Sequence, residues 1–252
     1  MKKIVMAFGL IIVLSLAGCQ QKGDMEVLTV LTSSGYEPYE MVDEDGQLTG
    51  FDIELMEALA SEAGIEIEWL DVSFEGIIAS LQAGQYEVAI AGITPTPDRA
   101  NVVDFGEVYY NSENGITNYM VYEYENSYNT LDDLQGLVVG AQLGTIQAEL
   151  LGELAEDYGF TVELRDTNSQ IIEEIKIGTI NVLLVESLVA DSIVEANSEF
   201  TKTELITDLD QLYGNAIAFA KGSGYVDIFN NALEVLKDNG TLDYLIAKWF
   251  QE

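Results

Sequence analysis

Arg99 is the side chain in this sequence best suited to bind an anion. It is one of only two arginines, the other being Arg165, in a chain with ten basic residues. A guanidinium is a planar fork that binds a carboxylate through two parallel hydrogen bonds. On the residues alone, two interpretations of Arg99 stay open: a carboxylate-binding site, or a surface ion pair with Asp98 or Glu107.

Two further segments have the chemistry of a binding site. Gly92 and Thr94 follow a predicted buried strand, and ligands of open α/β sheets bind beyond the carboxyl ends of strands. Gly92 allows close approach of its backbone, and Thr94 offers a hydroxyl. The stretch 144–146 precedes a predicted helix, whose free N–H groups and positive dipole end favour an anion. Ordinary loop and helix-cap chemistry is the alternative for both segments.

Residue types and motifs that the sequence lacks exclude most enzyme classes. The chain has no histidine, so it lacks the usual general base, the usual zinc ligand and any Ser-His or Cys-His arrangement. No GxGxxG, GK[ST] or SxxK motif occurs. We therefore expect neither a metal site nor a cofactor.

The N-terminal residues predict export and a lipid anchor. A pair of lysines precedes an apolar run over 4–17, which is shorter than the roughly 20 residues of a membrane-spanning helix. The run ends in a Leu-Ala-Gly-Cys stretch that resembles the bacterial lipobox, and an incidental cysteine is the alternative. We expect a signal peptide over 1–18 and a lipidated tether over 19–25. Because Cys19 is the only cysteine, no disulfide is expected.

The charge balance is strongly acidic. The formal net charge is −34, and removal of the two signal-peptide lysines would leave eight basic residues against 44 acidic ones, a balance of −36. Such a chain would be repelled by nucleic acid and by anionic lipid surfaces. The acidity suits either attraction of cationic ligands or a solvated surface for a salty habitat, and we favour the second interpretation.

Alternating hydrophobic patterns predict two α/β blocks in the roughly 230 mature residues. Strands are expected at 28–31, 65–70, 88–90, 137–141, 161–164, 181–185 and 216–220. Helices are expected at 53–64, 74–83, 145–155, 169–177, 187–196, 225–239 and 242–249, with a turn at 45–46. The segment 111–129 has little helical period and is expected to form a strand-like crossing between the blocks. Strand–helix–strand repetition implies parallel sheets with crossover helices.

An ordered set of short motifs resembles the extracellular solute-binding proteins of polar amino acid ABC importers, family 3 type, with arginine-type members most similar. The motifs are Gly35-Tyr36-Glu37-Pro38-Tyr39-Glu40, Gly50-Phe51-Asp52-Ile53-Glu54-Leu55, Phe74-Glu75-Gly76-Ile77-Ile78, Gly92-Ile93-Thr94-Pro95-Thr96-Pro97-Asp98-Arg99, Val103-Asp104-Phe105, Tyr109-Tyr110, Leu143-Gly144-Thr145-Ile146-Gln147, Tyr213-Gly214 and Lys248-Trp249-Phe250. Each motif is weak alone, but the ordered set spans nearly the whole mature chain.

The resemblance implies an α/β fold of the periplasmic binding protein-like II type. In that fold two Rossmann-like lobes are joined by two crossings, with a ligand cleft between them. Residues 26–112 plus 212–252 would form lobe 1, and 116–208 would form lobe 2.

By the same resemblance Arg99 would bind the carboxylate of an amino acid. Glu186, at a position where the family usually has aspartate, would bind the ammonium. A helix N-terminal acid stabilised by the dipole is the alternative for Glu186. Tyr36 and Phe74 match aromatic positions that flank the ligand side chain in the family, and core packing is their alternative.

The full set expected to bind the ligand is Ser33, Tyr36, Phe74, Gly92, Thr94, Arg99, Gln142, Thr145, Ile146, Gln147 and Glu186. Arginine or another polar amino acid is the expected ligand. Some members that prefer basic ligands carry an acid where this chain has Ser33 and Ser34, which weakens a strictly cationic interpretation. Asp52, Glu75 and Trp249 are expected to be caps and core residues.

The resemblance leaves two other functions open. A few relatives resemble cyclohexadienyl dehydratases, which need a carboxyl kept protonated in a dry cleft, and we expect no second acid beside Glu186. An amino acid sensor domain is the other alternative. The favoured prediction is a monomeric binding protein and not an enzyme. It would lie at the extracytoplasmic face of the membrane, held by its lipid alone, and would pass its ligand to the permease of an ABC importer.

Overall fold

The computed structural model describes residues 27–111, 117–206 and 214–250. The predicted signal peptide, Cys19 and its tether therefore lie outside the described residues, as do parts of both predicted crossings between the lobes. Within the described residues, no helix has the length and apolar character needed to cross a membrane.

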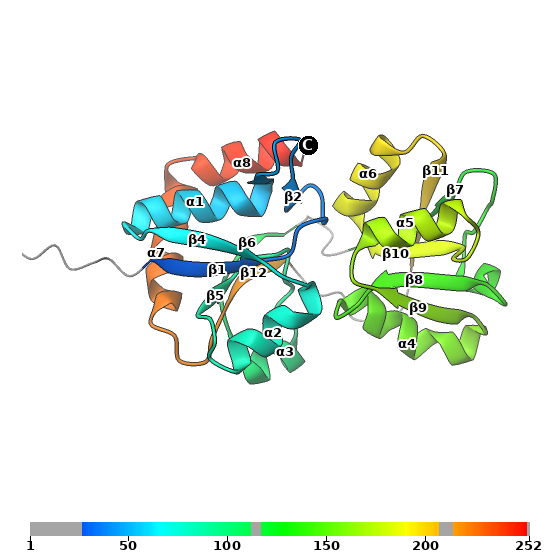
Figure 1. Ribbon diagram of the computed structural model, residues 1–252, viewed down its shortest axis with the longest axis horizontal. Coiled ribbons are helices and arrows are strands. Elements are labelled where there is room, and N and C mark those ends of the chain that lie inside the picture. Colours follow the sequence, from blue (N-terminus) through cyan, green and yellow to red (C-terminus); the bar gives the residue numbers. More distant parts are fainter. Residues whose placement is uncertain (1–26, 112–116, 207–213, 251–252) are drawn as a thin grey trace, which may run out of the picture.

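The first lobe is a five-stranded sheet with helices on both faces (Figure 1). Its strands, in spatial order, are β4 (Ile67–Asp71), β1 (Leu28–Thr32), β5 (Val88–Ala89), β12 (Asn215–Phe219) and β6 (Asp104–Tyr110). Its helices are α1 (Phe51–Ala63), α2 (Phe74–Gln82), α3 (Pro97–Val102), α7 (Tyr225–Asp238) and α8 (Thr241–Trp249), and a small ribbon pairs β2 (Met41–Val42) with β3 (Leu48–Thr49). In Figure 1, α1 and α8 lie above this sheet, and α2 and α3 lie below it.

The second lobe repeats this plan. Its strands, in spatial order, are β11 (Phe200–Leu205), β7 (Asn118–Glu123), β10 (Val182–Glu186), β8 (Val138–Gln142) and β9 (Thr161–Arg165). Its helices are η1 (Leu131–Leu134), α4 (Ile146–Tyr158), α5 (Asn168–Lys176) and α6 (Ser187–Ala196). Helices α5 and α6 cover one face and α4 covers the other (Figure 1).

The expectation of purely parallel sheets is wrong, because both sheets are mixed. Strand β1 is parallel to β4 and β5, whereas β12 is antiparallel to β5 and β6. In the second lobe β8 is parallel to β9 and β10, whereas β7 is antiparallel to β10 and β11. A crossover helix returns the chain to the same end of a sheet and yields a parallel strand. Strands β7 and β12 are the first strands after the chain passes from the other lobe, and no described crossover helix leads into either, so they run in the opposite direction.

Most predicted elements are present within a few residues of their expected ends. Gly64 closes α1 in the left-handed conformation, with φ 68°, as a C-terminal glycine does. Six elements were not predicted from the sequence, namely β2, β3, α3, β6, η1 and β11. Strand β7 lies inside the segment 111–129 and belongs to the second sheet, so only part of that segment is a crossing.

Candidate functional site

One pocket between the lobes brings together ten of the eleven residues expected to bind the ligand. Its wall consists of Tyr36, Phe74, Gly92, Thr94 and Arg99 from the first lobe and Gln142, Thr145, Ile146, Gln147 and Glu186 from the second. Ser33, the eleventh, is buried but is not part of this wall. The cavity volume is about 20 Å³, which is room for about one water molecule. An amino acid therefore fits only if the lobes part or the side chains move.

Arg99 is buried in this pocket, with 8% of its surface exposed. Its backbone is placed by the short helix α3, where the Thr96 hydroxyl caps the Arg99 N–H at 3.2 Å. Its Nη1 donates to the carbonyl of Thr94 at 2.9 Å, and its Nη2 donates across the pocket to the carbonyl of Gly144 at 3.0 Å. The guanidinium also lies 5.5 Å from the centre of the Phe74 ring.

No carboxylate of the described residues forms an ion pair with Arg99. Glu107, one suggested partner, instead pairs with Lys237 at 3.1 Å. Burial lowers the pKa of Arg99 below its ordinary value, as expected for a cation removed from water. The surface ion-pair interpretation of Arg99 is therefore wrong. Among the described residues its guanidinium bonds to carbonyl oxygens and lies beside a ring, and the charge of Glu149 offsets part of the fall in its pKa.

Glu186 faces the pocket from the second lobe. It is the last residue of β10 and the N-cap of α6, but its side chain makes no cap hydrogen bond. It is 5% exposed, and its Oε1 has no hydrogen-bond partner among the described residues. Burial raises the pKa of Glu186 to about 7, and a hydrogen bond from Tyr39 offsets part of that rise.

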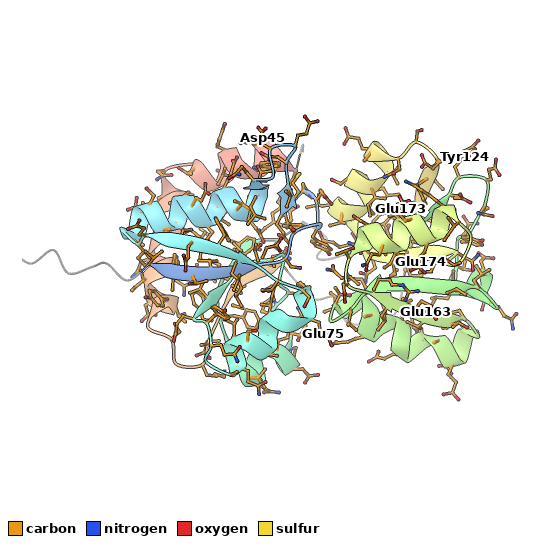
Figure 2. The ribbon with its side chains drawn as sticks, in the orientation of Figure 1. Asp45, Glu75, Tyr124, Glu163, Glu173 and Glu174 are labelled. Atoms are coloured by element: carbon orange, nitrogen blue, oxygen red, sulfur yellow. The ribbon has the colours of Figure 1, made fainter. Side chains whose placement is uncertain are left out.

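The two lobes touch closely beside Arg99. Gly144 has φ +80°, and a Cβ at this position would lie 2.9 Å from the Cα of Glu75 on α2. Glu75 is labelled in Figure 2, at the edge of the first lobe that faces the second. A side chain at position 144 would therefore push the lobes apart, so the close approach depends on glycine.

Comparison with known proteins identifies the family. A sequence profile described as bacterial extracellular solute-binding proteins, family 3, matches residues 28–252. This chain belongs to family 3. It is 39% identical over 219 residues to the arginine-binding extracellular protein ArtP of Bacillus subtilis (strain 168), covering 87% of this chain and 84% of ArtP.

Solved structures agree with this assignment. An ancestral arginine-binding protein bound to arginine superposes with a TM-score of 0.81 at 34% identity, covering 90% of this family 3 chain and 99% of the ancestral one. An ancestral arginine-binding protein bound to glutamine gives a TM-score of 0.81 at 33% identity, with coverage of 90% and 98%. The two-lobe α/β fold of the periplasmic binding protein-like II type is therefore confirmed.

The second lobe of this family 3 protein presents a helix N-terminus to the pocket. Thr145 caps α4, with its hydroxyl accepting from the Ala148 N–H at 3.2 Å. The amide nitrogen of Gln147 donates to Asn118 at 2.9 Å, and that of Gln142 donates to the Asp166 carbonyl at 3.0 Å. Both glutamines are thus oriented by their own lobe before any ligand binds.

Two buried acids behind the pocket were not predicted as site residues. Asp52 and Glu40 are 0% and 1% exposed, and the pKa of Glu186 responds to the nearby charge of Asp52. The expectation that no second acid lies beside Glu186 is therefore wrong. Asp52 is also no helix cap, since Gly50 occupies the N-cap of α1. The Gly50-Phe51-Asp52 motif was the only sequence signal for it.

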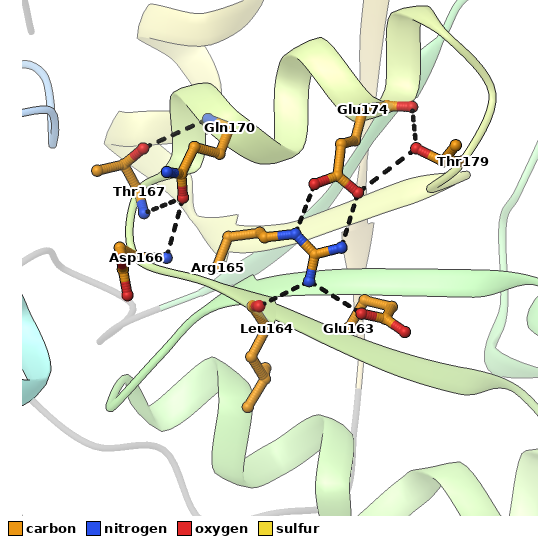
Figure 3. Close-up of polar contacts among 8 residues, drawn as sticks. All are labelled: Glu163, Leu164, Arg165, Asp166, Thr167, Gln170, Glu174 and Thr179. Atoms are coloured by element: carbon orange, nitrogen blue, oxygen red, sulfur yellow. Dashed lines mark hydrogen bonds and ion pairs between the residues drawn. The ribbon is translucent and has the colours of Figure 1, made fainter.

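Arg165, the other arginine of the family 3 chain, lies away from the pocket. It forms ion pairs with Glu174 at 2.5 Å and Glu163 at 2.9 Å (Figure 3). A further hydrogen bond joins it to the carbonyl of Leu164 at 2.8 Å. Its charge is matched within the second lobe, so nothing in these contacts calls for a ligand.

Proposed function

We propose that this protein captures a polar L-amino acid between its lobes and passes it to the permease of an ABC importer. One observation carries the proposal. The buried guanidinium of Arg99 lacks a carboxylate partner among the described residues, and the buried carboxyl of Glu186, on the other lobe, has an oxygen without a partner there. An unpaired buried charge is costly. An α-amino acid carries a carboxylate and an ammonium at fixed spacing, so one molecule supplies both missing partners.

Arginine is the favoured ligand. Tyr36 and Phe74 would enclose its aliphatic stem and attract its guanidinium, while Gln142 and Gln147 would face polar ligand atoms. The names of ArtP and of the ancestral protein bound to arginine support this choice. The ancestral structure with glutamine supports a wider range of polar amino acids.

Capture would proceed by closure of the lobes. The units that move would be residues 26–112 plus 212–252 and residues 116–208. Because Arg99 and Glu186 lie on different lobes, the open state offers an amino acid only half of its contacts, and binding selects the closed state. Ligand-driven compaction in X-ray scattering is the expected result.

Cys19 would hold the protein at the outer face of the membrane. The family description, extracellular, supports export, and the lipobox-like stretch supports a lipid on Cys19. One acyl chain binds a membrane only marginally, so stable anchoring implies more than one. Cys19→Ser should release the protein to the medium, and unchanged membrane fractionation would contradict the anchor.

A ligand panel tests the function. A soluble form without residues 1–19 is melted with each of the twenty amino acids, ornithine and citrulline. A ligand at ~100 Kd stabilises by ~2.7 kcal/mol, so one cluster of basic or polar amino acids should raise Tm and be recovered unchanged by mass spectrometry. If no amino acid raises Tm, the proposal fails.

A dehydratase is the second candidate, and one observation favours it. A buried Glu186 with a pKa of about 7 holds a proton at a pH where most carboxyls have lost theirs, as a general acid must. Incubation with a prephenate-like acid, followed by mass spectrometry, separates the candidates. Conversion by wild type but not by Glu186→Gln would establish catalysis and displace the transport role.

A further inference from the structure

Gly92 lines the pocket, and buried side chains bind both its N–H and its carbonyl. The Oδ2 of Asp52 accepts from the Gly92 N–H at 2.7 Å and from the Tyr109 hydroxyl at 2.8 Å. Asn215 donates to the Gly92 carbonyl at 2.7 Å. Gly92 has φ +56°, and a Cβ there would lie 3.2 Å from the Tyr36 ring. The position of this part of the pocket wall therefore depends on where Asp52 is held.

Glu40 packs against Asp52 in the interior and leaves three oxygens to explain. Both carboxyl oxygens of Glu40 and the Oδ1 of Asp52 lack a hydrogen-bond donor among the described residues. The two acids are neighbours, because the Asp52 N–H donates to the carbonyl of Tyr39, the residue before Glu40, at 2.9 Å, and the charge of Asp52 raises the pKa of Glu40. Two ionised carboxylates cannot hydrogen-bond, and they repel strongly in a low dielectric. A single proton between them removes the repulsion and provides the missing donor.

In the described part of the chain, no positive charge acts on Glu40 to replace that proton. The charges that act on Glu40 are those of Asp52, Glu186, Glu37 and Asp71, all acidic. Tyr36, Tyr39 and Tyr109 face the same interior, and Arg99 acts on Tyr36 from the pocket side. Burial is the largest cause that raises the pKa of both acids, that of Asp52 to about 7.

We propose that Glu40 and Asp52 share one proton, and that this proton holds Asp52 against the Gly92 amide and so shapes the pocket wall. Glu40 is then a positioning residue that acts through Asp52. Its influence on ligand affinity rests on the proposed function, whereas the shared proton does not.

The shared proton has a consequence for stability. In the unfolded chain both acids lose their protons near pH 4, whereas in the folded chain burial raises the pKa of both, that of Asp52 to about 7. Between these values the folded state binds more protons than the unfolded state, so stability falls as pH rises. Each retained proton adds about one unit to the slope of log K for unfolding against pH.

Glu40→Gln, Asp52→Asn and the double variant test the shared proton in the ligand-free protein. An amide N–H can replace the shared O–H, so each variant should remain folded. Urea unfolding from about pH 4.5 to 7.5 should show each single variant losing about one unit of slope, and the double variant losing no more than either. Glu62→Gln, at an exposed position, is the matched control and should keep the wild-type slope. Unchanged slopes in the single variants, or twice the loss in the double variant, would overturn the proposal.

Ligand affinity tests the positioning role separately. Glu40→Gln should bind L-arginine as wild type does, because its amide restores the donor. Glu40→Leu has no donor and should bind about tenfold more weakly. If both variants bind alike, Glu40 does not position the wall. If Glu40→Leu fails to fold, the Asp52→Asn and Glu40→Gln slopes still decide the shared proton. Wild-type protein that binds no amino acid would contradict the proposed function and leave those slopes as they are.

Discussion

The two arginines of this chain sit in opposite environments. Arg165 lies at the surface of the second lobe, where Glu163 and Glu174 match its charge and raise its pKa (Figure 3). Arg99 is buried between the lobes, and within the described part of the chain its guanidinium bonds to the carbonyls of Thr94 and Gly144. Because both are the same residue type in an acidic chain, the difference lies in what the fold places around them. A buried guanidinium held by carbonyls alone can still accept a carboxylate from a ligand.

The largest expected effect is the difference in ligand affinity between Arg99→Ala and Arg165→Ala. Removing one partner of a buried charge pair costs ~2 to 5 kcal/mol, which is about 30-fold to several thousand-fold in Kd. Arg99→Ala should therefore nearly abolish amino acid binding in calorimetry, while Arg165→Ala binds as wild type. An Arg99→Ala affinity within about threefold of wild type would remove the carboxylate role from Arg99.

Glu186 should make ligand affinity depend on pH, unlike Arg99, which stays charged. Only its ionised form pairs with an ammonium, and in the ligand-free protein its pKa is about 7. Below that pH binding must displace a proton, so affinity should fall by up to about tenfold per pH unit, and it should level off above pH 7. Calorimetry from about pH 5.5 to 8.5 measures this profile. Glu186→Gln should bind more weakly and flatten the profile, whereas a wild-type profile in that variant would place the titrating group elsewhere.

Gly144 tests the contact that Arg99 makes across the pocket. Gly144→Ala combines backbone strain at φ +80° with a clash against Glu75, while Gly136→Ala carries similar strain at φ +79° with nothing within 4 Å. Overpacking costs about 1 to 3 kcal/mol, so Gly144→Ala should bind about fivefold to a hundredfold more weakly.

Gly136→Ala is the matched control for strain and should keep wild-type affinity. Ligand-bound Gly144→Ala should also be less compact than wild type in X-ray scattering. Equal affinity in the two variants would show that closure does not require this contact.

The smallest effect is expected at Arg165 itself. Its ion pairs are partly exposed and screened by solvent. Arg165→Met should lower Tm by less than about 4 °C and leave ligand affinity unchanged. A large loss of affinity with an unchanged Tm would mean that Arg165, too, belongs to the ligand site.

Local signals in the sequence predicted most of the fold. Periodicity and punctuating residues such as Gly64 mark helices and buried strands, because these depend on near neighbours. The directions of β7 and β12 depend on which lobe the chain has just left, which no local pattern records. Short α3 and the exposed-edge strand β11 carried too little periodicity to be predicted.

Site residues that belong to short sequence motifs could be predicted, whereas site residues that meet only through packing of the fold could not. The motif around Arg99 and the one at Gly144 and Thr145 named residues that now line one pocket. The Glu40–Asp52 pair was missed. The two acids are 12 positions apart in the sequence, and only the folded interior brings them together with no cation of the described residues acting on Glu40. Ser33 was expected from the family resemblance, but it is buried outside the lining of this pocket.

The central claim is that Arg99 binds the α-carboxylate of the ligand. L-arginine and L-argininamide differ only in that carboxylate, so calorimetry of both with wild type and Arg99→Ala isolates the contact. Wild type should prefer L-arginine by at least about 30-fold, and Arg99→Ala should bind both compounds with similarly weak affinity. A preference of the same size in both proteins would contradict the account.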